Sequence, residues 1–328
     1  MKRNVLFAVA FFATLAASAQ SIAAVSPSNE TTMYQTLDKA VSEAVPGSII
    51  YLPGGGFQIS DETKITNKLT IMGVSYRADA DNADGATVIA GNLHFEGGSS
   101  GSSVVGVFIS GNITVGAEDA SVTNITVRFC NANSIQVKNS NSSGLIINQC
   151  YLRNNSNFNY CNAQLENSII HSVQRINGGT INNCIITSSF VQPGYTYQQI
   201  TLYDIKGSTI TNNFILNFNG HTGNDCIISH NCRGKEGWGD NPILLDDGIS
   251  WDDVFEKNKG VSITSNYKLK GKWGKNEGSD GKDIGIYGGS GFKEEKSLAP
   301  IPRIVSKKVD ERTDGSGMLH IEVTVKAE

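Results

Sequence analysis

Four side chains near the middle of the chain have the types and spacing to bind or cleave a carbohydrate. Tyr195, Tyr197 and Tyr203 occur close together, and Asp204 follows them directly. Alternate residues of a strand point to the same side, so these phenols would line up beside one carboxylate. Tyrosine rings can stack on sugars, and a carboxylate can accept hydrogen bonds from hydroxyl groups or act as a base. The alternative is that the tyrosines only cover an exposed sheet.

A second candidate group lies in residues 233–260, between two strand-like segments. Trp238 and Trp251 could stack on sugar rings, and Asp252 belongs to a cluster of acidic residues in the same segment. A hydrolase needs two carboxyl groups at a defined separation, and a lyase needs a base and often Ca²⁺. Calcium is therefore an optional cofactor, although these carboxylates lack the spacing of a calcium-binding loop. The alternative is a solvated loop whose tryptophans pack on the protein.

The composition argues against nucleic acid as a partner and allows a folded core. The chain of 328 residues has 27 Lys and Arg against 31 Asp and Glu, a formal net charge of -4. A nucleic-acid-binding protein presents a basic face to the phosphate backbone. With 39% hydrophobic and 18% charged residues, the sequence is typical of a folded protein rather than a disordered one.

A short motif recurs through the middle of the chain: an apolar residue, any residue, Asn, any residue, then an apolar residue or Cys. The four clear copies are centred on Asn148, Asn167, Asn183 and Asn212. Such recurrence predicts a coil in which each short strand lies parallel on the previous one. Stacked amides could bond one another and tolerate a left-handed turn, so we expect these asparagines to form a structural ladder.

This pattern predicts an all-β fold, a single-stranded parallel β-helix over residues 47–292. At roughly 22 residues per coil, the stack would have about eleven coils and a length of about 50 Å. Residues 20–46 would cover its N-terminal end with a helix that begins near Met33. The apolar face of this helix would consist of Leu37, Ala40, Val41, Ala44 and Val45.

Residues 293–328 differ from the stack and predict a linker followed by an antiparallel β-hairpin. Residues 303–309 and 318–326 alternate like strands around the turn signal at 313–317. We expect this hairpin to cover the C-terminal end of the stack, where open strand edges would otherwise be exposed. Docking of a partner is the alternative.

The first 19 residues predict a cleaved secretory signal peptide. Lys2 and Arg3 precede an apolar run at 5–17, which is too short to span a membrane, and residues 17–19 form a small-x-small cleavage site. No Cys precedes Cys130, so a lipid-modified cysteine after the signal is not expected. We expect a secreted or periplasmic protein, monomeric and without a membrane span. Its six cysteines match no compact disulfide framework, so buried thiols are favoured over disulfides.

Several segments resemble the secreted bacterial parallel β-helix proteins of the pectate-lyase-like superfamily. Residues 44–52, 56–59 and 68–73 look like the opening of such proteins. The Gly-rich segment 278–289 and the closing strand at 319–327 are similar to the ending of an uncharacterised branch. The resemblance covers residues 33–328 and implies a right-handed β-helix. It does not imply one activity, because these folds include lyases, hydrolases, esterases, adhesins and inert stalks.

The familiar catalytic motifs of that superfamily are missing from this chain. The lyase pattern Arg-x-Pro-x-x-Arg does not occur, and Trp251-Asp252-Asp253 lacks the His of the Trp-x-Asp-His segment. The hydrolase pattern is represented only by fragments at 246–247 and 220–222. We therefore expect the protein to engage an extracellular polysaccharide or cell-surface glycan by binding. The alternatives are a lyase or hydrolase with an unfamiliar active site, and a structural or adhesive surface protein.

Overall fold

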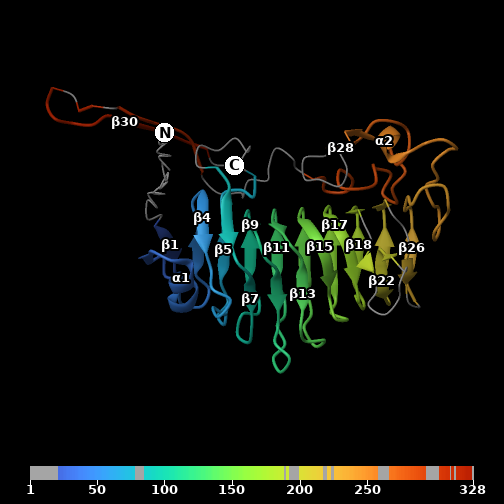
Figure 1. Ribbon diagram of the computed structural model, residues 1–328, viewed down its shortest axis with the longest axis horizontal. Coiled ribbons are helices and arrows are strands. Elements are labelled where there is room, and N and C mark those ends of the chain that lie inside the picture. Colours follow the sequence, from blue (N-terminus) through green and yellow to red (C-terminus); the bar gives the residue numbers. More distant parts are fainter. Residues whose placement is uncertain are drawn as a thin grey trace, which may run out of the picture.

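The chain folds into a right-handed parallel β-helix, which confirms the predicted fold class (Figure 1). The computed structural model describes residues 21–77, 85–187, 190–191, 199–216, 220–222, 225–257, 266–292, 303–310, 312–313 and 315–326. The expected signal peptide and two of the candidate tyrosines, Tyr195 and Tyr197, lie outside these residues.

The first sheet of the helix contains 11 strands. In spatial order they are β2 (Thr31–Tyr34), β1 (Ile22–Val25), β3 (Ile49–Tyr51), β5 (Thr70–Met72), β8 (Ser103–Val105), β11 (Thr126–Arg128), β14 (Leu145–Asn148), β16 (Ala163–Glu166), β18 (Thr180–Asn182), β23 (Thr209–Thr211) and β26 (Ile227–Ser229). Here β1 and β2 are antiparallel, and the other nine strands form a parallel stack. Nine stacked strands enclose eight turns, fewer than the eleven coils expected, because residues 233–292 leave the stack.

The second sheet has 13 strands arranged in two rows, which form the remaining faces of the helix. One row runs through β4 (Gly55–Gln58), β6 (Thr87–Ala90), β9 (Phe108–Ile109), β12 (Asn131–Ala132), β15 (Tyr151–Asn157), β17 (Ile169–Gln174), β19 (Ile185–Ile186) and β24 (Phe214–Ile215). The other runs through β7 (Leu93–Phe95), β10 (Ile113–Val115), β13 (Ile135–Val137), β15, β17, β22 (Leu202–Ile205) and β25 (Gly220–Thr222). The long strands β15 and β17 take part in both rows and so connect them.

The interior of the helix is filled by columns of apolar side chains that repeat from coil to coil. Ile147, Leu165 and Ile181 pair in register between adjacent strands and are fully buried. Stacking of like on like removes these side chains from water in every coil, which is the main stabilising contribution. Of the six cysteines, five are buried, in agreement with the expected interior packing.

A short helix covers the N-terminal end of the stack. Helix α1 (Leu37–Glu43) begins after Thr36, whose hydroxyl accepts a hydrogen bond from the Lys39 N–H. Its apolar face is buried as expected, apart from Val45, which is 52% exposed. The helix does not begin near Met33, because that residue lies in β2, which adds an antiparallel strand to the sheet.

Residues 233–250 close the C-terminal end of the stack. The Asp240 N–H donates to the Ile228 carbonyl at 2.8 Å, and the Ile243 N–H donates to the Asn231 carbonyl at 3.1 Å. Ile243 is 7% exposed, and Trp238 packs partly buried against the core. This segment therefore occupies the place expected for the C-terminal hairpin.

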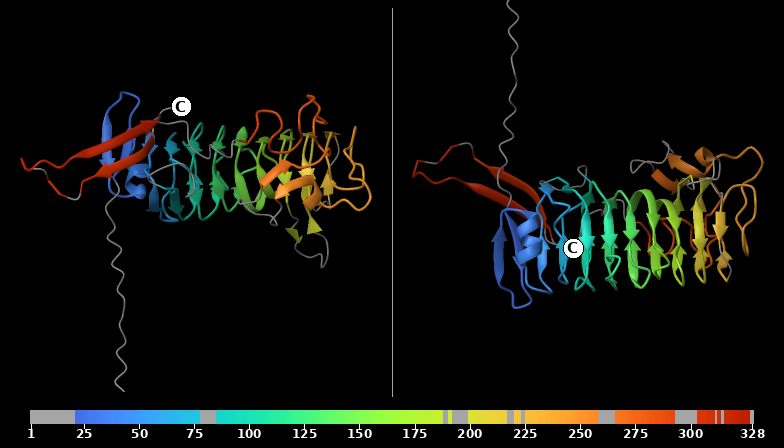
Figure 2. Two further views of the ribbon diagram at one scale, coloured as in Figure 1. Left: turned by 90° about the horizontal axis from the view of Figure 1, so that it is seen from above. Right: turned by 60° about the horizontal axis from the view of Figure 1, so that its bottom comes forward.

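That hairpin instead lies beside the N-terminal end. Strands β29 (Arg303–Val309) and β30 (Ile321–Lys326) pair antiparallel, as predicted. Both views in Figure 2 show them projecting past the end that carries α1, β1 and β2. The expected position of the hairpin at the C-terminal end is therefore wrong. The last coil is covered by residues 233–250 instead.

The remaining short elements are outside the stack. They are β20 (Phe190–Val191) paired with β21 (Gln199–Ile200), and helix α2 (Trp251–Val254) followed by β27 (Phe255–Lys257), which pairs with β28 (Asn266–Leu269). Within the described residues, no helix combines the length and the apolar character needed to cross a membrane.

Candidate functional site

One corner of the helix is formed by stacked residues in the left-handed backbone conformation. Strand register places Gln149, Asn167, Asn183, Asn212 and His230 at equivalent positions, and all have φ between 46° and 60°. We call this column the covered corner. Asn148 lies opposite Glu166, one residue before the column, so its expected place in the ladder is taken by Gln149.

The asparagines of the covered corner bind the C-terminal segment rather than one another. The Asn167 side-chain amide donates to the carbonyls of Ile286 and Gly288, and its oxygen accepts from Ser290. The Asn212 side chain accepts from the Ser279 N–H at 2.8 Å. The Gly-rich segment 274–292 therefore forms a strap across this corner, and the amides hold it in place.

The expected contact between stacked amides occurs one residue further along the chain. The Asn213 side chain donates to Asn231 Oδ1 at 2.9 Å, and both residues are buried. The Asn213 oxygen also accepts from the Cys184 N–H at 2.8 Å. These amides belong to an interior column that otherwise contains Cys and Ser, so the ladder is shorter than predicted and lies inside the helix.

A second corner exposes larger and more reactive side chains. Tyr160, Arg175 and Asp204 adopt left-handed φ values of 64°, 56° and 53°. The Tyr160 N–H donates to the Arg175 carbonyl at 2.6 Å, and the Arg175 N–H donates to the Tyr203 carbonyl at 2.8 Å. Residues other than Gly, Asn and Asp rarely adopt this conformation, and such backbone strain is found preferentially at functional sites.

Two cations and two phenols surround the single carboxylate of this corner. The Tyr160 hydroxyl donates a hydrogen bond to Asp204, and Lys206 Nζ lies 3.0 Å from Asp204 Oδ1. The Lys206 ammonium lies 4.9 Å from the centre of the Tyr160 ring, and the Arg175 guanidinium lies 5.7 Å from that of Tyr203. We call these five residues the open corner. All are half-buried or exposed, so a ligand can reach them.

The pKa shifts fix the charge states of the open corner at neutral pH. Partial burial raises the pKa of Asp204, but the Tyr160 hydroxyl and the Lys206 ammonium outweigh it and lower the pKa overall. The hydrogen bond to Asp204 raises the pKa of Tyr160 and also that of Lys206. The corner therefore holds an ionised carboxylate, a neutral phenol and a charged ammonium. At neutral pH, neither the protonated phenol nor this weakly basic carboxylate readily accepts a proton.

A row of outward-facing polar side chains leads to the open corner. The residues pair in register across adjacent strands, so they lie about 4.8 Å apart. The row, which we call the polar column, consists of His94, Thr114, Gln136, Asn157, Gln174 and Tyr203. All six side chains are half-buried, and each directly follows a buried residue. Amide and hydroxyl groups at a regular spacing can bond a linear polymer.

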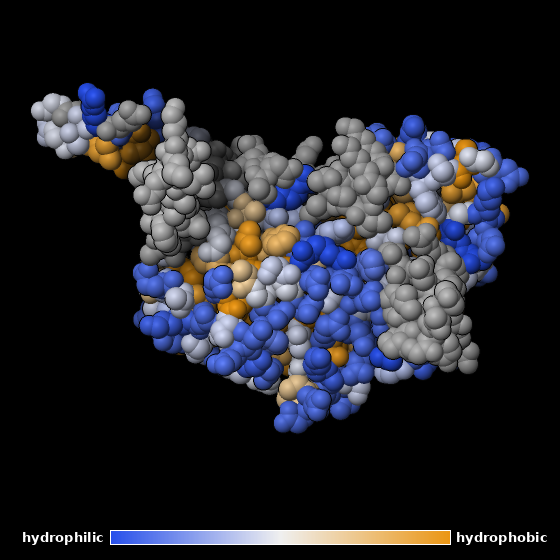
Figure 3. Space-filling view, in the orientation of Figure 1, coloured by the Kyte–Doolittle hydropathy of each residue, from blue (hydrophilic) through white to orange (hydrophobic). Residues whose placement is uncertain are grey.

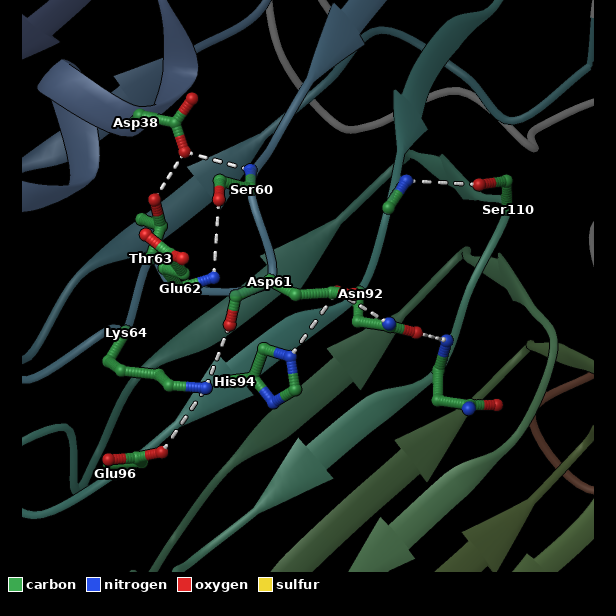
Figure 4. A network of polar contacts seen from close by, with 12 residues as sticks. Asp38, Ser60, Asp61, Glu62, Thr63, Lys64, Asn92, His94, Glu96 and Ser110 are labelled. Atoms are coloured by element: carbon green, nitrogen blue, oxygen red, sulfur yellow. Dashed lines mark hydrogen bonds and ion pairs between the residues drawn. The ribbon is translucent and has the colours of Figure 1, made fainter.

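The first residue of the polar column, His94, belongs to a separate polar network (Figure 4). Asp61 Oδ1 accepts from Asn92 Nδ2 at 2.7 Å and lies 3.7 Å from His94 Nε2. The Asn92 hydrogen bond contributes most to lowering the pKa of Asp61. Asp38 of α1 accepts from the Ser60 N–H at 2.9 Å. The network thus ties the 60–64 loop to α1 and to β7.

The tryptophan candidates are placed mainly in packing roles. Trp251 Nε1 donates to the Leu216 carbonyl at 2.9 Å, and its ring contacts those of Phe214 and Phe255. Trp238 packs against the core at the C-terminal end. Asp252 is exposed in the first turn of α2, away from the open corner in sequence and in contacts. Of the predicted site residues within the described part, the structure brings together only Tyr203 and Asp204.

Sequence reasoning missed Tyr160, Arg175 and Lys206. Tyr160 and Arg175 share a signal with Asp204, because each directly precedes a buried residue, namely Cys161, Ile176 and Ile205. Aligning the chain on these buried residues would have stacked the three positions. Among the described residues, no group of three or more His, Cys, Asp or Glu side chains could hold a metal ion. The optional calcium therefore has no cluster of this kind in that part of the chain.

The comparisons give no relative from which a function could be transferred. No family model, curated protein or solved structure matches this chain.

Proposed function

We propose that this is an exported β-helix protein that binds an extracellular polysaccharide along the polar column, with the open corner as the main contact. The observation that carries the proposal is the grouping of Tyr203, Tyr160, Arg175 and Lys206 around Asp204 at the end of that column. Phenol rings offer surfaces for sugar rings, and the charged groups offer hydrogen bonds to hydroxyl or carboxylate groups.

The charge states favour binding over catalysis. A glycoside hydrolase needs two carboxyl groups, and the open corner contains one, that of Asp204. A lyase needs a base, but the lowered pKa of Asp204 and the raised pKa of Tyr160 make both poor proton acceptors at neutral pH. The enzyme and the structural protein remain the alternative classes, and their predictions differ.

The parallel stack and the resembling segments at 44–52 and 278–289 support placement in the pectate-lyase-like superfamily. Export is supported by the apolar leader at 5–17. The superfamily placement and the export are both part of the proposal. Export is included because a protein that binds a glycan outside the cell must be exported.

A glycan array followed by calorimetry tests the proposal. We expect retention of at least one polysaccharide, with no new reducing ends and no ultraviolet absorbance from an unsaturated uronate. Tyr203→Ala should weaken binding at least about tenfold, or ~1.4 kcal/mol. Asp252→Asn, an exposed change away from the open corner, is the matched control and should bind like the wild type. Turnover that is abolished by Tyr203→Ala or Asp204→Asn would support the enzyme. A protein that shows no glycan retention and no turnover would support the structural alternative.

A further inference from the structure

The polar column lies beside a second column of polar residues, which we call the support column. It consists of the residues two positions before each member of the polar column, namely Asn92, Asn112, Ser134, Asn155, Ser172 and Thr201. Hydrogen bonds join several of these side chains from coil to coil. The Ser134 hydroxyl donates to Asn112 Oδ1, and the Ser172 hydroxyl donates to Asn155 Oδ1, both at 2.7 Å. The two columns together contain no carboxylate, ammonium or guanidinium group.

The support column orients the polar column. Gln136 Nε2 donates to Ser134 Oγ at 2.9 Å and to the Asn155 carbonyl at 2.8 Å, so the donor side of this amide is held by two neighbours. None of the described residues donates to the Gln136 side-chain oxygen or bonds the Gln174 side chain. A polar group that is already held in place loses less conformational entropy when it binds a ligand. The polar column is therefore prepared to bond hydroxyl groups.

The polar column places one side chain on each of six successive coils. Five steps of about 4.8 Å give the column a length of about 24 Å. A sugar residue in an extended polysaccharide, such as a β-1,4-linked chain, advances the chain by about the height of one coil. An extended chain parallel to the axis of the β-helix therefore places one sugar on each coil. A tightly coiled or branched glycan loses this alignment after a few coils.

The charges around the polar column have both signs and do not recur from coil to coil. At the first coil, Lys64 lies 3.7 Å from Glu96. Glu118 and Asp119 lie in the turn that follows the second coil, and Lys138 lies in the third coil. The part of the stack around β7 and β13 is mainly hydrophilic in Figure 3, which agrees with exposed polar groups there. A polymer with one carboxylate per sugar would need a cation on each coil, and Glu118 and Asp119 would repel it.

We propose that the ligand of the polar column is an uncharged, extended polysaccharide that places one sugar residue on each coil. This inference rests on the proposed glycan-binding function and adds the class of the glycan and the length of the bound segment. The six coils of the column bind six sugars. The amides of Gln136, Asn157 and Gln174 bond their hydroxyl groups, and one sugar ring stacks on Tyr203 at the open corner.

Calorimetry with cello-, manno- and xylo-oligosaccharides tests the length and the charge of the ligand. These chains are neutral and extended, and we expect at least one series to bind. From about two to about six sugars the affinity should rise at least tenfold, and longer chains should bind no more tightly. Raising the salt concentration from about 0.05 to 0.5 M should change the affinity less than twofold, because no ion pair to the ligand is screened. Oligogalacturonates and oligomannuronates should bind at least tenfold more weakly.

Two Gln variants separate the column from the rest of the surface. Gln136 lies three coils from Tyr203, beyond the reach of a trisaccharide seated at the open corner. Gln136→Ala should therefore weaken hexasaccharide binding at least about threefold and leave trisaccharide binding unchanged. Gln164→Ala, at an exposed position of β16 in the first sheet, is the matched control and should change neither. Circular dichroism should show that both variants keep the β-helix.

The possible failures of this inference are distinguishable from failure of the proposed function. Affinity that stops rising after two or three sugars, or a hexasaccharide that binds Gln136→Ala as tightly as the wild type, would overturn the alignment of one sugar per coil but keep the open corner. Tighter binding of the uronate chains, with an affinity that falls as salt is added, would overturn the uncharged class. If no glycan binds at all, the proposed function is wrong and this inference falls with it.

Discussion

The covered corner and the open corner have the same backbone geometry but differ in what their side chains contact. Both stack left-handed residues from coil to coil. In the covered corner, Asn167 and Asn183 are 2% exposed and lie under the strap. In the open corner, Tyr160 and Arg175 are half-buried, and no described strap crosses them.

The side chains of the two corners differ where the strap crosses, because the covered corner has Asn167, Asn183 and Asn212 there, although Gln149 and His230 share its left-handed conformation. Asn tolerates the left-handed conformation, and its short amide can bond nearby carbonyls, so it suits a buried structural contact. Tyr and Arg rarely adopt the left-handed conformation and have no short amide that could bond nearby carbonyls from it. Their presence in the open corner is better explained by what they present to solvent. The comparison therefore separates a corner that stabilises the fold from a corner that, in the proposed function, contacts the glycan.

The largest expected effect is on stability at the covered corner. Asn167→Ala removes the donor to the carbonyls of Ile286 and Gly288 and leaves both buried. We expect the free energy of unfolding to fall by about 2–4 kcal/mol. Denaturant titration measures this change. Asn167→Gly keeps the backbone freedom but not the hydrogen bonds, and should recover about 1 kcal/mol of it. A loss below about 1 kcal/mol in Asn167→Ala would mean that the strap does not depend on this corner.

The open corner should show the reverse behaviour. Arg175→Gly relieves a left-handed φ of 56° and removes the guanidinium beside the Tyr203 ring. We expect glycan affinity to fall at least about tenfold, while the free energy of unfolding changes by less than about 1 kcal/mol. Calorimetry and denaturant titration on the same sample measure both. If affinity is kept while stability collapses, the open corner is structural.

The packing of Trp251 provides a smaller test of where the glycan site lies. Trp251→Phe loses the hydrogen bond to the Leu216 carbonyl and part of the contact with Phe214. We expect a loss of about 1 kcal/mol in stability and no change in glycan affinity. Weaker binding with unchanged stability would move the glycan site toward α2.

The smallest effect expected is that of pH between about 5 and 8. The pKa of Asp204 in the folded chain lies below its ordinary value. The Asp204 charge therefore makes its full contribution to glycan binding above the ordinary carboxyl range, about pH 4. This contribution is lost as the pH falls through the lower pKa of Asp204 in the folded chain. Glycan affinity measured by calorimetry should be flat from pH 5 to 8 and decline below about pH 4. A midpoint between pH 6 and 7 would indicate a group other than Asp204.

The repeats were sufficient to predict the parallel stack, because interior positions such as Ile147 and Leu165 must pair in register. They were not sufficient to assign the corners. Asn148 and Asn167 occupy the same place in the sequence motif, but the buried residues set the register and shift one against the other by a residue. The strap could not be predicted at all, since the contacts of Asn167 join residues 119 and 121 positions apart.

The candidate site was predicted only in part for a similar reason. Tyr203 and Asp204 are adjacent and attract attention as a pair. Tyr160 reaches Asp204 from 44 positions away, through the stacking of coils of unequal length. Residues 233–257 carry the other predicted group, Trp238, Trp251 and Asp252, and part of this segment closes the end of the stack, a role that its Trp and Asp content did not indicate.

The most direct test of this account is a crystal structure of the protein with an oligosaccharide identified on the array. We predict a ligand that lies along the polar column and contacts Tyr203 and Arg175, with the strap still bound to Asn167. A ligand seated against the 233–260 segment, or one that displaces the strap from the covered corner, would contradict the assignment of the two corners.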